Sequence, residues 1–146
     1  MTFTEENGDL FTENILAEYA LCHCISSDFA LGAGIAKAFT KMGVKKALCE
    51  QFTNNWQGRG YCLITETNGV TVGNLVTKKR YFHKPTLETL RQALEDLRSQ
   101  ALEIKIQKLA MPKIGCGLDK LDWADVHKVI KDIFSGTEFE ILIRYL

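Results

Sequence analysis

Hydrophobic and polar positions along the chain alternate between short strand-like runs and longer helical stretches. Residues 19–25 are apolar and too few for a helix, which predicts a buried strand, and a further short strand is expected at 2–5. Residues 60–66 and 70–77 favour strands, and the Asn68-Gly69 pair between them predicts a tight antiparallel hairpin. These runs predict one part of a sheet.

Apolar residues spaced by three and four indicate helices that begin at Ile35 and at Val44. The clearest helix is expected after Pro85, with Thr86 as its N-cap. Its single apolar stripe comprises Leu87, Leu90, Leu94, Leu97 and Ala101.

The rest of the chain continues the alternation. Residues 108–114 predict a buried strand, Asp122 is expected to cap a helix, and residues 139–145 predict a closing strand. The inner face of that helix carries Val126, Ile130 and Ile133. Strands alternating with helices predict an α/β fold, in which helices cover a sheet and ligand-binding loops follow the strand ends.

The composition fits one domain spanning residues 1–146, with 46% hydrophobic residues to form one core. Because 18 basic residues balance 18 acidic ones, there is no general positive field for nucleic acid or an anionic membrane, although a local basic patch stays open. The N-terminus resembles no signal peptide, and no apolar run reaches the ~18 residues of a membrane span. We therefore expect an intracellular, cytoplasmic protein, or a nuclear one in a eukaryote.

The five cysteines are odd in number and show no C-x-x-C spacing, which argues against a disulfide framework and a structural zinc site. They are expected to be reduced and mostly buried: Cys22, Cys24, Cys49, Cys62 and Cys116.

Two glycine-bearing turns each follow an apolar strand and precede a helix. They are Gly32-Ala33-Gly34-Ile35 and Gly115-Cys116-Gly117-Leu118-Asp119. Glycines permit close backbone approach and a helix N-terminus favours an anion, so two such loops facing each other predict a diphosphate site. The third glycine of a dinucleotide fingerprint and the GK[ST] of a P-loop are both missing, which disfavours those alternatives.

Six blocks along the chain resemble the macro domain family, and more narrowly its terminal ADP-ribose protein glycohydrolase branch. They run in the same order from about residue 7 to the C-terminus: GDLF from Gly8, HCIS from His23, GAGIA from Gly32, TKKR from Thr77, HKPT from His83 and MPKIGCGLD from Met111. The resemblance implies a three-layer α/β/α fold with a mixed central sheet of about six strands.

The same resemblance implies a site for ADP-ribose. Asp9 would contact the adenine amino group, Leu10 would line the adenine pocket, and Ser26 would lie near the distal ribose. The two glycine loops would enclose the diphosphate through Gly32, Ala33, Gly34 and Ile35 on one side and Lys113, Ile114, Gly115, Cys116, Gly117 and Leu118 on the other.

In this branch, Lys78 would attack the anomeric carbon of the distal ribose and Asp119 would assist opening and release. A deprotonated amine can condense with an anomeric carbon, a state that partial burial or the neighbouring Lys79 would favour, and a nearby carboxylate can move the protons. On local pattern alone, adjacent lysines are ordinary solvated charges and Asp119 could be a helix cap, although Asp122 is better placed for that.

Other candidates have simpler interpretations. Cys116 has no histidine evidently placed to activate it, so it is interpreted as a small loop residue. His23 is expected to be a hydrogen-bonded core histidine, since successive strand residues point to alternate faces and cannot share a metal with both neighbouring cysteines. His83 and His127 are expected to be surface or structural residues. No metal and no cofactor are expected.

The chain departs from the branch near its C-terminus, where Arg144 occupies the usual position of an aromatic residue beside adenine. Tyr145 follows one residue later, which on a strand is the opposite face. The Arg144 guanidinium could itself stack on adenine, so Arg144, Tyr145 and Leu146 are all candidate contacts.

Three functions remain open on the sequence. The first is a hydrolase that removes mono-ADP-ribose from acidic side chains of proteins and deacylates O-acyl-ADP-ribose. The second keeps the site but acts on ADP-ribosylated nucleic acid, and the third is a non-catalytic reader that binds ADP-ribose without turnover.

Overall fold

The computed structural model describes residues 1–146 as six strands and five helices. The elements are β1 (Thr2–Asn7), α1 (Glu13–Glu18), β2 (Ala20–Ser26), α2 (Ala36–Lys41), α3 (Val44–Gln51), β3 (Tyr61–Thr67), β4 (Val70–Lys78), α4 (Leu87–Glu103), β5 (Lys108–Met111), α5 (Trp123–Phe134) and β6 (Glu140–Tyr145). No helix combines the length and the apolar character that crossing a bilayer requires.

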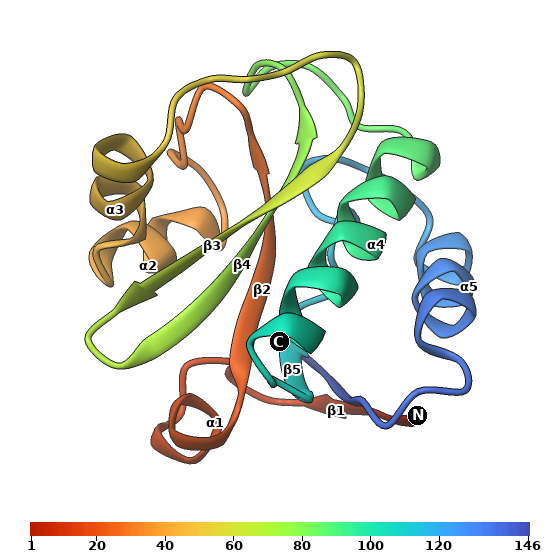
Figure 1. The fold of residues 1–146 in the computed structure, drawn as a ribbon. Coiled ribbons are helices and arrows are strands. Elements are labelled where there is room, and N and C mark those ends of the chain that lie inside the picture. Colours follow the sequence, from red (N-terminus) through yellow and green to blue (C-terminus); the bar gives the residue numbers. More distant parts are fainter.

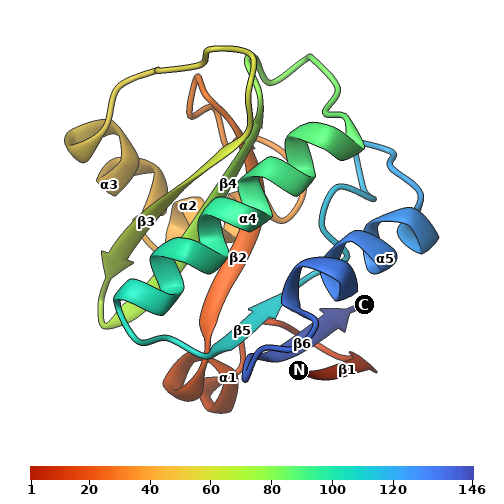
Figure 2. The same ribbon diagram turned by 45° about the vertical axis from the view of Figure 1, so that its right-hand side comes forward.

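All six strands form one sheet in the order β1-β6-β5-β2-β4-β3. Neighbouring strands are parallel except β3 and β4, which pair antiparallel. Helices α4 and α5 cover one face, and the shorter α2 and α3 lie on the other (Figures 1 and 2). The predicted three-layer fold with a mixed six-stranded sheet is confirmed.

The hairpin forms where the sequence predicts it. Asn68 and Gly69 both adopt positive φ, 52° and 78°, and Thr67 pairs with Val70 across the turn. Positive φ at both turn positions matches the right-handed twist of the flanking strands, and Asn and Gly tolerate it best.

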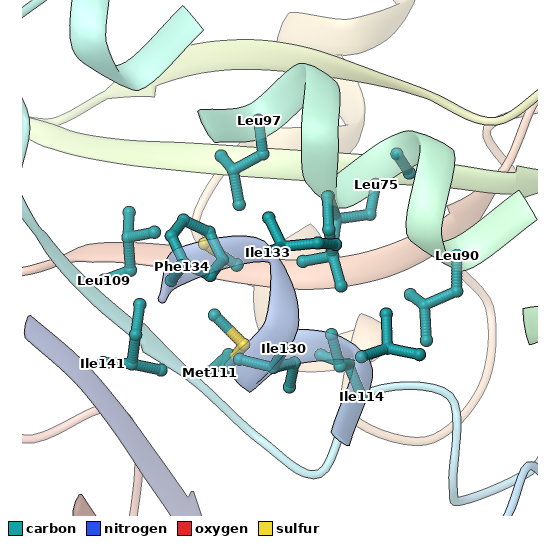
Figure 3. Packing of buried hydrophobic residues seen from close by; sticks show 14 of the residues in the cluster. Leu75, Leu90, Leu97, Leu109, Met111, Ile114, Ile130, Ile133, Phe134 and Ile141 are labelled. Atoms are coloured by element: carbon teal, nitrogen blue, oxygen red, sulfur yellow. The ribbon is translucent and has the colours of Figure 1, made fainter. Parts of the chain in front are cut away.

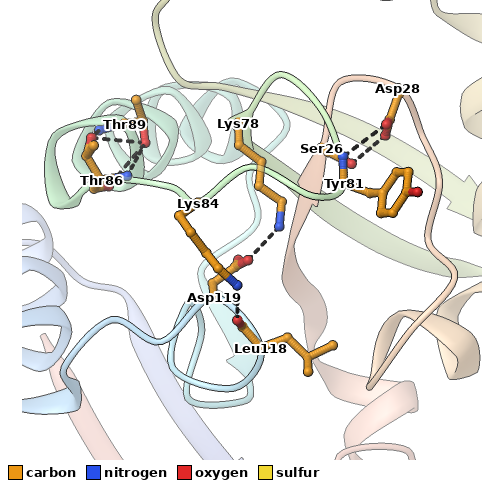
Figure 4. Close-up of polar contacts among 9 residues, drawn as sticks. All are labelled: Ser26, Asp28, Lys78, Tyr81, Lys84, Thr86, Thr89, Leu118 and Asp119. Atoms are coloured by element: carbon orange, nitrogen blue, oxygen red, sulfur yellow. Dashed lines mark hydrogen bonds and ion pairs between the residues drawn. The ribbon is translucent and has the colours of Figure 1, made fainter.

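Helix α4 begins at its predicted cap. The Thr86 hydroxyl accepts from the Thr89 backbone N–H at 3.0 Å, and the Thr89 hydroxyl accepts from the Thr86 N–H at 3.1 Å, which completes a capping box (Figure 4). The predicted stripe packs on the sheet, and Leu97 lies directly against Gly73. A Cβ atom added to Gly73 would be 2.8 Å from Leu97 Cδ1, so only glycine fits at this position without a shift. Figure 3 shows this core closed by α5 through Ile130, Ile133 and Phe134.

The opposite face has its own core, which includes Phe39 of α2 and Leu48 of α3 packed over Leu21 and Val76. Because a strand alternates its side chains, β2 contributes Leu21 and Ile25 to this core and Cys22 to the core beneath α4. The central strand is therefore buried on both sides and fixes the cavity that opens at its end.

Two boundaries differ from the prediction. Strand β5 ends at Met111 and not at residue 114, because Pro112 has no N–H to donate to a ladder. Helix α1 was not predicted; Thr12 caps it by accepting from the Ile15 N–H at 3.4 Å, and Ile15 is its buried anchor.

Candidate active site

A cavity of about 770 Å³ lies at the carboxyl ends of β2, β4 and β5. These ends meet at one edge of the sheet because the three strands run parallel, and such edges are where α/β folds bind ligands. The volume is in the range of about 300–1,000 Å³ that small-molecule sites occupy. Its walls are Ser26, the loop before α2, Lys78, and the loop between β5 and α5.

Lys78 and Asp119 meet in this wall. Lys78 is the last residue of β4, and its Nζ donates to Asp119 Oδ1 at 2.5 Å (Figure 4). Their side chains are 13% and 14% exposed, so both face the cavity and little bulk solvent. A lysine amine and a carboxylate in direct contact can pass a proton from one to the other, and here they would do so next to a bound ligand.

Unpaired backbone amides line the cavity on two sides. No acceptor within the chain bonds the N–H groups of Gly32, Ala33, Gly34 or Ile35, and the same holds for Ile114, Gly115, Gly117 and Leu118. Gly34 and Gly115 have φ of 61° and 73°, a region that suits glycine. Loops of free amides form concave anion sites, so this arrangement suits a diphosphate.

Asp28 organises the loop after β2. Its Oδ1 accepts from the Ser26 hydroxyl at 2.5 Å and from the Ala30 N–H at 3.2 Å, and its Oδ2 accepts from the Tyr81 N–H at 3.0 Å. Partial burial alone would raise the pKa of the carboxyl, but these hydrogen bonds outweigh it and hold the pKa below its usual value. Asp28 thus joins the β2 and β4 loops as a charged, fixed group.

A second contact joins the segment after β4 to the loop between β5 and α5. Lys84 Nζ donates to the Leu118 carbonyl oxygen at 2.7 Å (Figure 4). On the other side, the Leu118 Cδ1 atom lies 3.6 Å from the position of a Cβ on Gly34. Leu118 therefore spans the distance between the two amide loops.

Most predicted ligand residues line the cavity. With Lys78 and Asp119, the cavity wall includes Ser26, Gly32, Ala33, Gly34, Ile35, Lys113, Ile114, Gly115, Gly117 and Leu118. Cys116 does not line it; its thiol donates to the Ile114 carbonyl oxygen at 3.3 Å, and burial, followed by the nearby Asp122 charge, raises its pKa to about 11. A thiol with so high a pKa is a poor nucleophile, in agreement with its interpretation as a loop residue.

The residues predicted for adenine lie outside this cavity wall. Asp9 accepts from the Phe11 N–H at 3.0 Å through Oδ1, and Leu10 is buried. Arg144 donates from Nε to Glu6 Oε1 at 2.8 Å and from Nη1 to the Asp9 carbonyl oxygen at 3.1 Å.

Tyr145 points to the other face of β6, where Lys113 Nζ lies 4.1 Å from its ring centroid. The terminal Leu146 is 94% exposed. Of the C-terminal candidates, Arg144 is thus the one on the Asp9 side.

Three wall or loop residues escaped the sequence interpretation: Asp28, Tyr81 and Lys84. A signal existed for Asp28, because Ser-Ser-Asp directly after a strand favours an Asx-type turn. Tyr81 and Lys84 act through loop contacts between distant segments, which no local pattern reveals.

His23 is buried as expected and lines the cavity floor, with Nε2 2.6 Å from Asn74 Oδ1 and its ring stacked on Phe39. Its Nδ1 has no partner, so the prediction of a fully hydrogen-bonded histidine is wrong for that atom. Burial lowers the pKa of His23 to about 4 against the opposing effect of the Asn74 hydrogen bond. No cluster of His, Cys, Asp or Glu is arranged to hold a metal ion.

Comparison with known proteins gives consistent matches. The family model described as "Macro domain" matches residues 22–130. The chain is similar to "ADP-ribose glycohydrolase OARD1" of Bos taurus, with 39% identity over 143 residues, which are 98% of this chain and 91% of that protein. It is 25% identical to the "DNA ADP-ribosyl glycohydrolase" of Thermus aquaticus over 82% of this chain and 35% of that protein. Among solved structures, the Mycobacterium tuberculosis DarG macrodomain has a TM-score of 0.81 at 23% identity, covering 99% of this chain and 98% of that one.

Proposed function

Since this chain belongs to the macro domain family, we propose that it binds ADP-ribose and is a hydrolase, which removes mono-ADP-ribose from acidic side chains of proteins and deacylates O-acyl-ADP-ribose. The bovine relative is named as an ADP-ribose glycohydrolase, and the match extends over nearly the whole of both chains. The five thiols are all unpaired, which supports a reducing, intracellular location.

The contact between Lys78 Nζ and Asp119 Oδ1 carries the proposal. A module that only binds ADP-ribose needs the free amides of the two loops, but it needs neither an amine nor a carboxylate beside the ribose. A shielded amine in contact with a proton acceptor is the arrangement that nucleophilic catalysis requires.

The proposed reaction begins with the diphosphate held by the amides of the Gly32–Ile35 and Ile114–Leu118 loops. Asp119 takes a proton from the Lys78 ammonium, and the amine nitrogen bonds to the anomeric carbon of the distal ribose. The bond from that carbon to the acceptor's carboxylate oxygen breaks, and the acceptor leaves with the electron pair. Water then bonds through its oxygen to the anomeric carbon as the carbon–nitrogen bond breaks, the electron pair stays on the nitrogen, and one water proton passes to solvent. Asp119 returns its proton to the Lys78 amine, and free ADP-ribose departs.

Asp9 and Leu10 are proposed to hold the adenine, with Arg144 beside them. Arg144 donates to the Asp9 carbonyl oxygen, so its guanidinium plane is held next to the residue that would bond the adenine amino group. Planar guanidinium groups stack on aromatic rings, and Arg144 can take the place of the aromatic residue at this position. In this proposal Tyr145 supports Lys113 and makes no adenine contact.

The test is release of ADP-ribose from a glutamate-linked mono-ADP-ribosylated protein by wild type, Lys78→Ala and Asp119→Ala, with ADP-ribose binding measured by calorimetry for each. Both variants should bind and lose turnover by about 10²-fold or more. Lys46→Ala, at an 80% exposed lysine on α3, is the matched control and should behave as wild type. Binding without turnover by the wild-type protein would instead identify a reader.

A further inference from the structure

Two helices hold the backbone that leads into the Gly32–Ile35 loop. Lys45 Nζ, on α3, donates to the Ala30 carbonyl oxygen at 3.0 Å. The Thr40 hydroxyl, on α2, donates to the Leu31 carbonyl oxygen at 3.1 Å. No other group in the chain donates to either oxygen. Two successive peptide groups are therefore each bound to a helix through the carbonyl.

The direction of these carbonyls fixes the direction of the N–H groups that share their peptide planes. A trans peptide group points its N–H away from its own carbonyl oxygen, and the chain contains no cis peptide bond. The Ala30 carbonyl shares its plane with the Leu31 N–H, and the Leu31 carbonyl shares its plane with the Gly32 N–H. Neither N–H has an acceptor within the chain, and all three residues line the cavity. Both N–H groups thus point away from the two helices and are free for a ligand of the cavity.

The peptide group between Leu31 and Gly32 has room to rotate. A Cβ on Gly32 would meet no atom nearer than 3.9 Å, and glycine itself tolerates a wide range of φ. Phe29 and Leu31, just before it, have φ of 54° and 44°, which bulky side chains rarely adopt. The backbone is therefore not held in this shape by its own preferences, and the Thr40 hydrogen bond opposes the rotation.

Rotation of this peptide group would matter for an anion. It would turn the Leu31 carbonyl oxygen toward the ligand and the Gly32 N–H away from it. Successive N–H groups that converge on one side form an anion site, whereas a carbonyl oxygen in the same place repels a phosphate. Neither Thr40 nor Lys45 lines the cavity, so both act on a ligand through the backbone and not by contact.

We infer that Thr40 and Lys45 are positioning residues, which hold the Leu31 and Gly32 N–H groups toward the diphosphate of ADP-ribose. The inference rests on the proposed function for the identity of the ligand. It adds two residues outside the cavity wall to those on which the affinity of the site depends.

Thr40 has a second acceptor, which decides how it is substituted. The Ala36 carbonyl oxygen, one turn back in α2, lies 3.0 Å from the hydroxyl, an arrangement that threonines in helices commonly adopt. Valine keeps the shape of the side chain and removes the proton that the two oxygens share. Serine keeps that proton, so Thr40→Ser is the conservative variant that should rescue the function lost in Thr40→Val.

Calorimetry with ADP-ribose and with inorganic pyrophosphate tests the role of Thr40. Thr40→Val should weaken ADP-ribose binding about tenfold, and Thr40→Ser should bind within about twofold of wild type, because one hydrogen bond is lost in the first and kept in the second. Pyrophosphate has neither adenine nor ribose, so the same order of affinities with pyrophosphate would assign the effect to the diphosphate loops. Equal ADP-ribose affinity in wild type and Thr40→Val would overturn the role of Thr40.

Lys45 is tested against its neighbour on α3. Lys45→Met removes the contact with Ala30, and Lys46→Met removes the same charge from an exposed lysine beside Glu50. Only Lys45→Met should weaken ADP-ribose binding. Equal losses in the two variants would mean that the charge of α3, and not the hydrogen bond, is responsible, and would overturn the role of Lys45.

Turnover separates positioning from a general effect on the site. N–H groups that hold the diphosphate bind substrate and transition state alike, so Thr40→Val should raise KM about tenfold and leave kcat within about twofold. A fall in kcat at unchanged KM would contradict a positioning role.

The same measurements distinguish this inference from the proposed function. If wild type binds ADP-ribose but releases none from a glutamate-linked protein, the hydrolase proposal fails, and weaker binding by Thr40→Val would still support the inference. Turnover by wild type with equal binding by Thr40→Val would keep the hydrolase and overturn the inference. A wild-type protein that binds neither ADP-ribose nor pyrophosphate would overturn both.

Discussion

The Arg144 guanidinium joins the last strand to the loop after the first, with Nη1 donating to the Asp9 carbonyl oxygen at 3.1 Å. Nε of the same group is held by Glu6 at 2.8 Å, so the plane of the guanidinium is fixed from two directions. In the proposed adenine subsite, this fixed plane beside Asp9 would give the adenine ring a surface on which to stack without a large loss of side-chain entropy.

Replacing Arg144 therefore tests the adenine subsite. Arg144→Ala should weaken ADP-ribose binding about tenfold, since a stacking partner and the support of Asp9 are both lost, and Arg144→Lys should not restore it because an ammonium has no planar face. Calorimetry measures both. Arg91→Ala removes an arginine from a surface ion pair with Asp132 on the α4–α5 side, so it should bind as wild type. Unchanged affinity in Arg144→Ala would refute the stacking role.

A substitution at Gly34 tests the proposed role of the loops with free backbone N–H groups, Gly32–Ile35 and Ile114–Leu118. Its φ of 61° makes Gly34→Ala strained by about 1–2 kcal/mol, and relief of that strain would turn the neighbouring N–H groups away from the proposed diphosphate site. We expect ADP-ribose affinity to fall about tenfold. Gly58→Ala, at a φ of 81° with nothing within 4 Å of the new Cβ, imposes similar strain elsewhere. Equal affinity losses in the two variants would mean that general destabilisation, and not the loop, is responsible.

Burial of His23 predicts how stability depends on pH. Its pKa is lowered from 6.5 to about 4, so between these values the unfolded chain binds a proton that the folded chain does not. Stability should therefore fall as the pH drops from 6.5 to about 4, by about 3 kcal/mol in total, and level off below. The depressed pKa of Asp28 acts at lower pH, because that carboxyl loses its charge only below its usual 3.8.

Urea denaturation at several pH values between 7 and 4 measures this slope. In His23→Gln the slope of the free energy of unfolding against pH should be much smaller. The absolute stability of the variant does not matter, because each protein's stability at low pH is compared with its own stability at pH 7. A slope that persists in His23→Gln would assign the effect to other groups.

Thiol reactivity gives a further test of the structure. Cys49 is the exposed cysteine, whereas burial raises the pKa of Cys22 to about 12 and that of Cys62 well above its usual value. Iodoacetamide at neutral pH should therefore add first to Cys49, which mass spectrometry locates, and hydrolase activity should survive. Early labelling of Cys62 in the intact protein would contradict the packing beneath α4.

The sequence predicts those features that local chemistry determines. The Asn68-Gly69 turn, the Thr86 and Asp122 caps and the stripe along α4 all follow from neighbouring residues, and all are confirmed. The contact of Lys78 with Asp119 could be anticipated only from a family resemblance, because no spacing rule relates side chains 41 residues apart. The same reason explains why the contacts of Asp28 with Tyr81 and of Lys84 with Leu118 were not predicted.

The strand order has a consequence for the folding reaction. Lys78 is the last residue of β4 and Asp119 follows β5, and β2 lies between these two strands. The β3–β4 hairpin forms from adjacent sequence, but β2 must pair with segments far along the chain, such as Leu21 with Val72, before the two side chains can meet. Non-local pairing is slow to form. During refolding, catalytic turnover should therefore appear only when the central strand β2 has been inserted, which is later than formation of the β3–β4 hairpin.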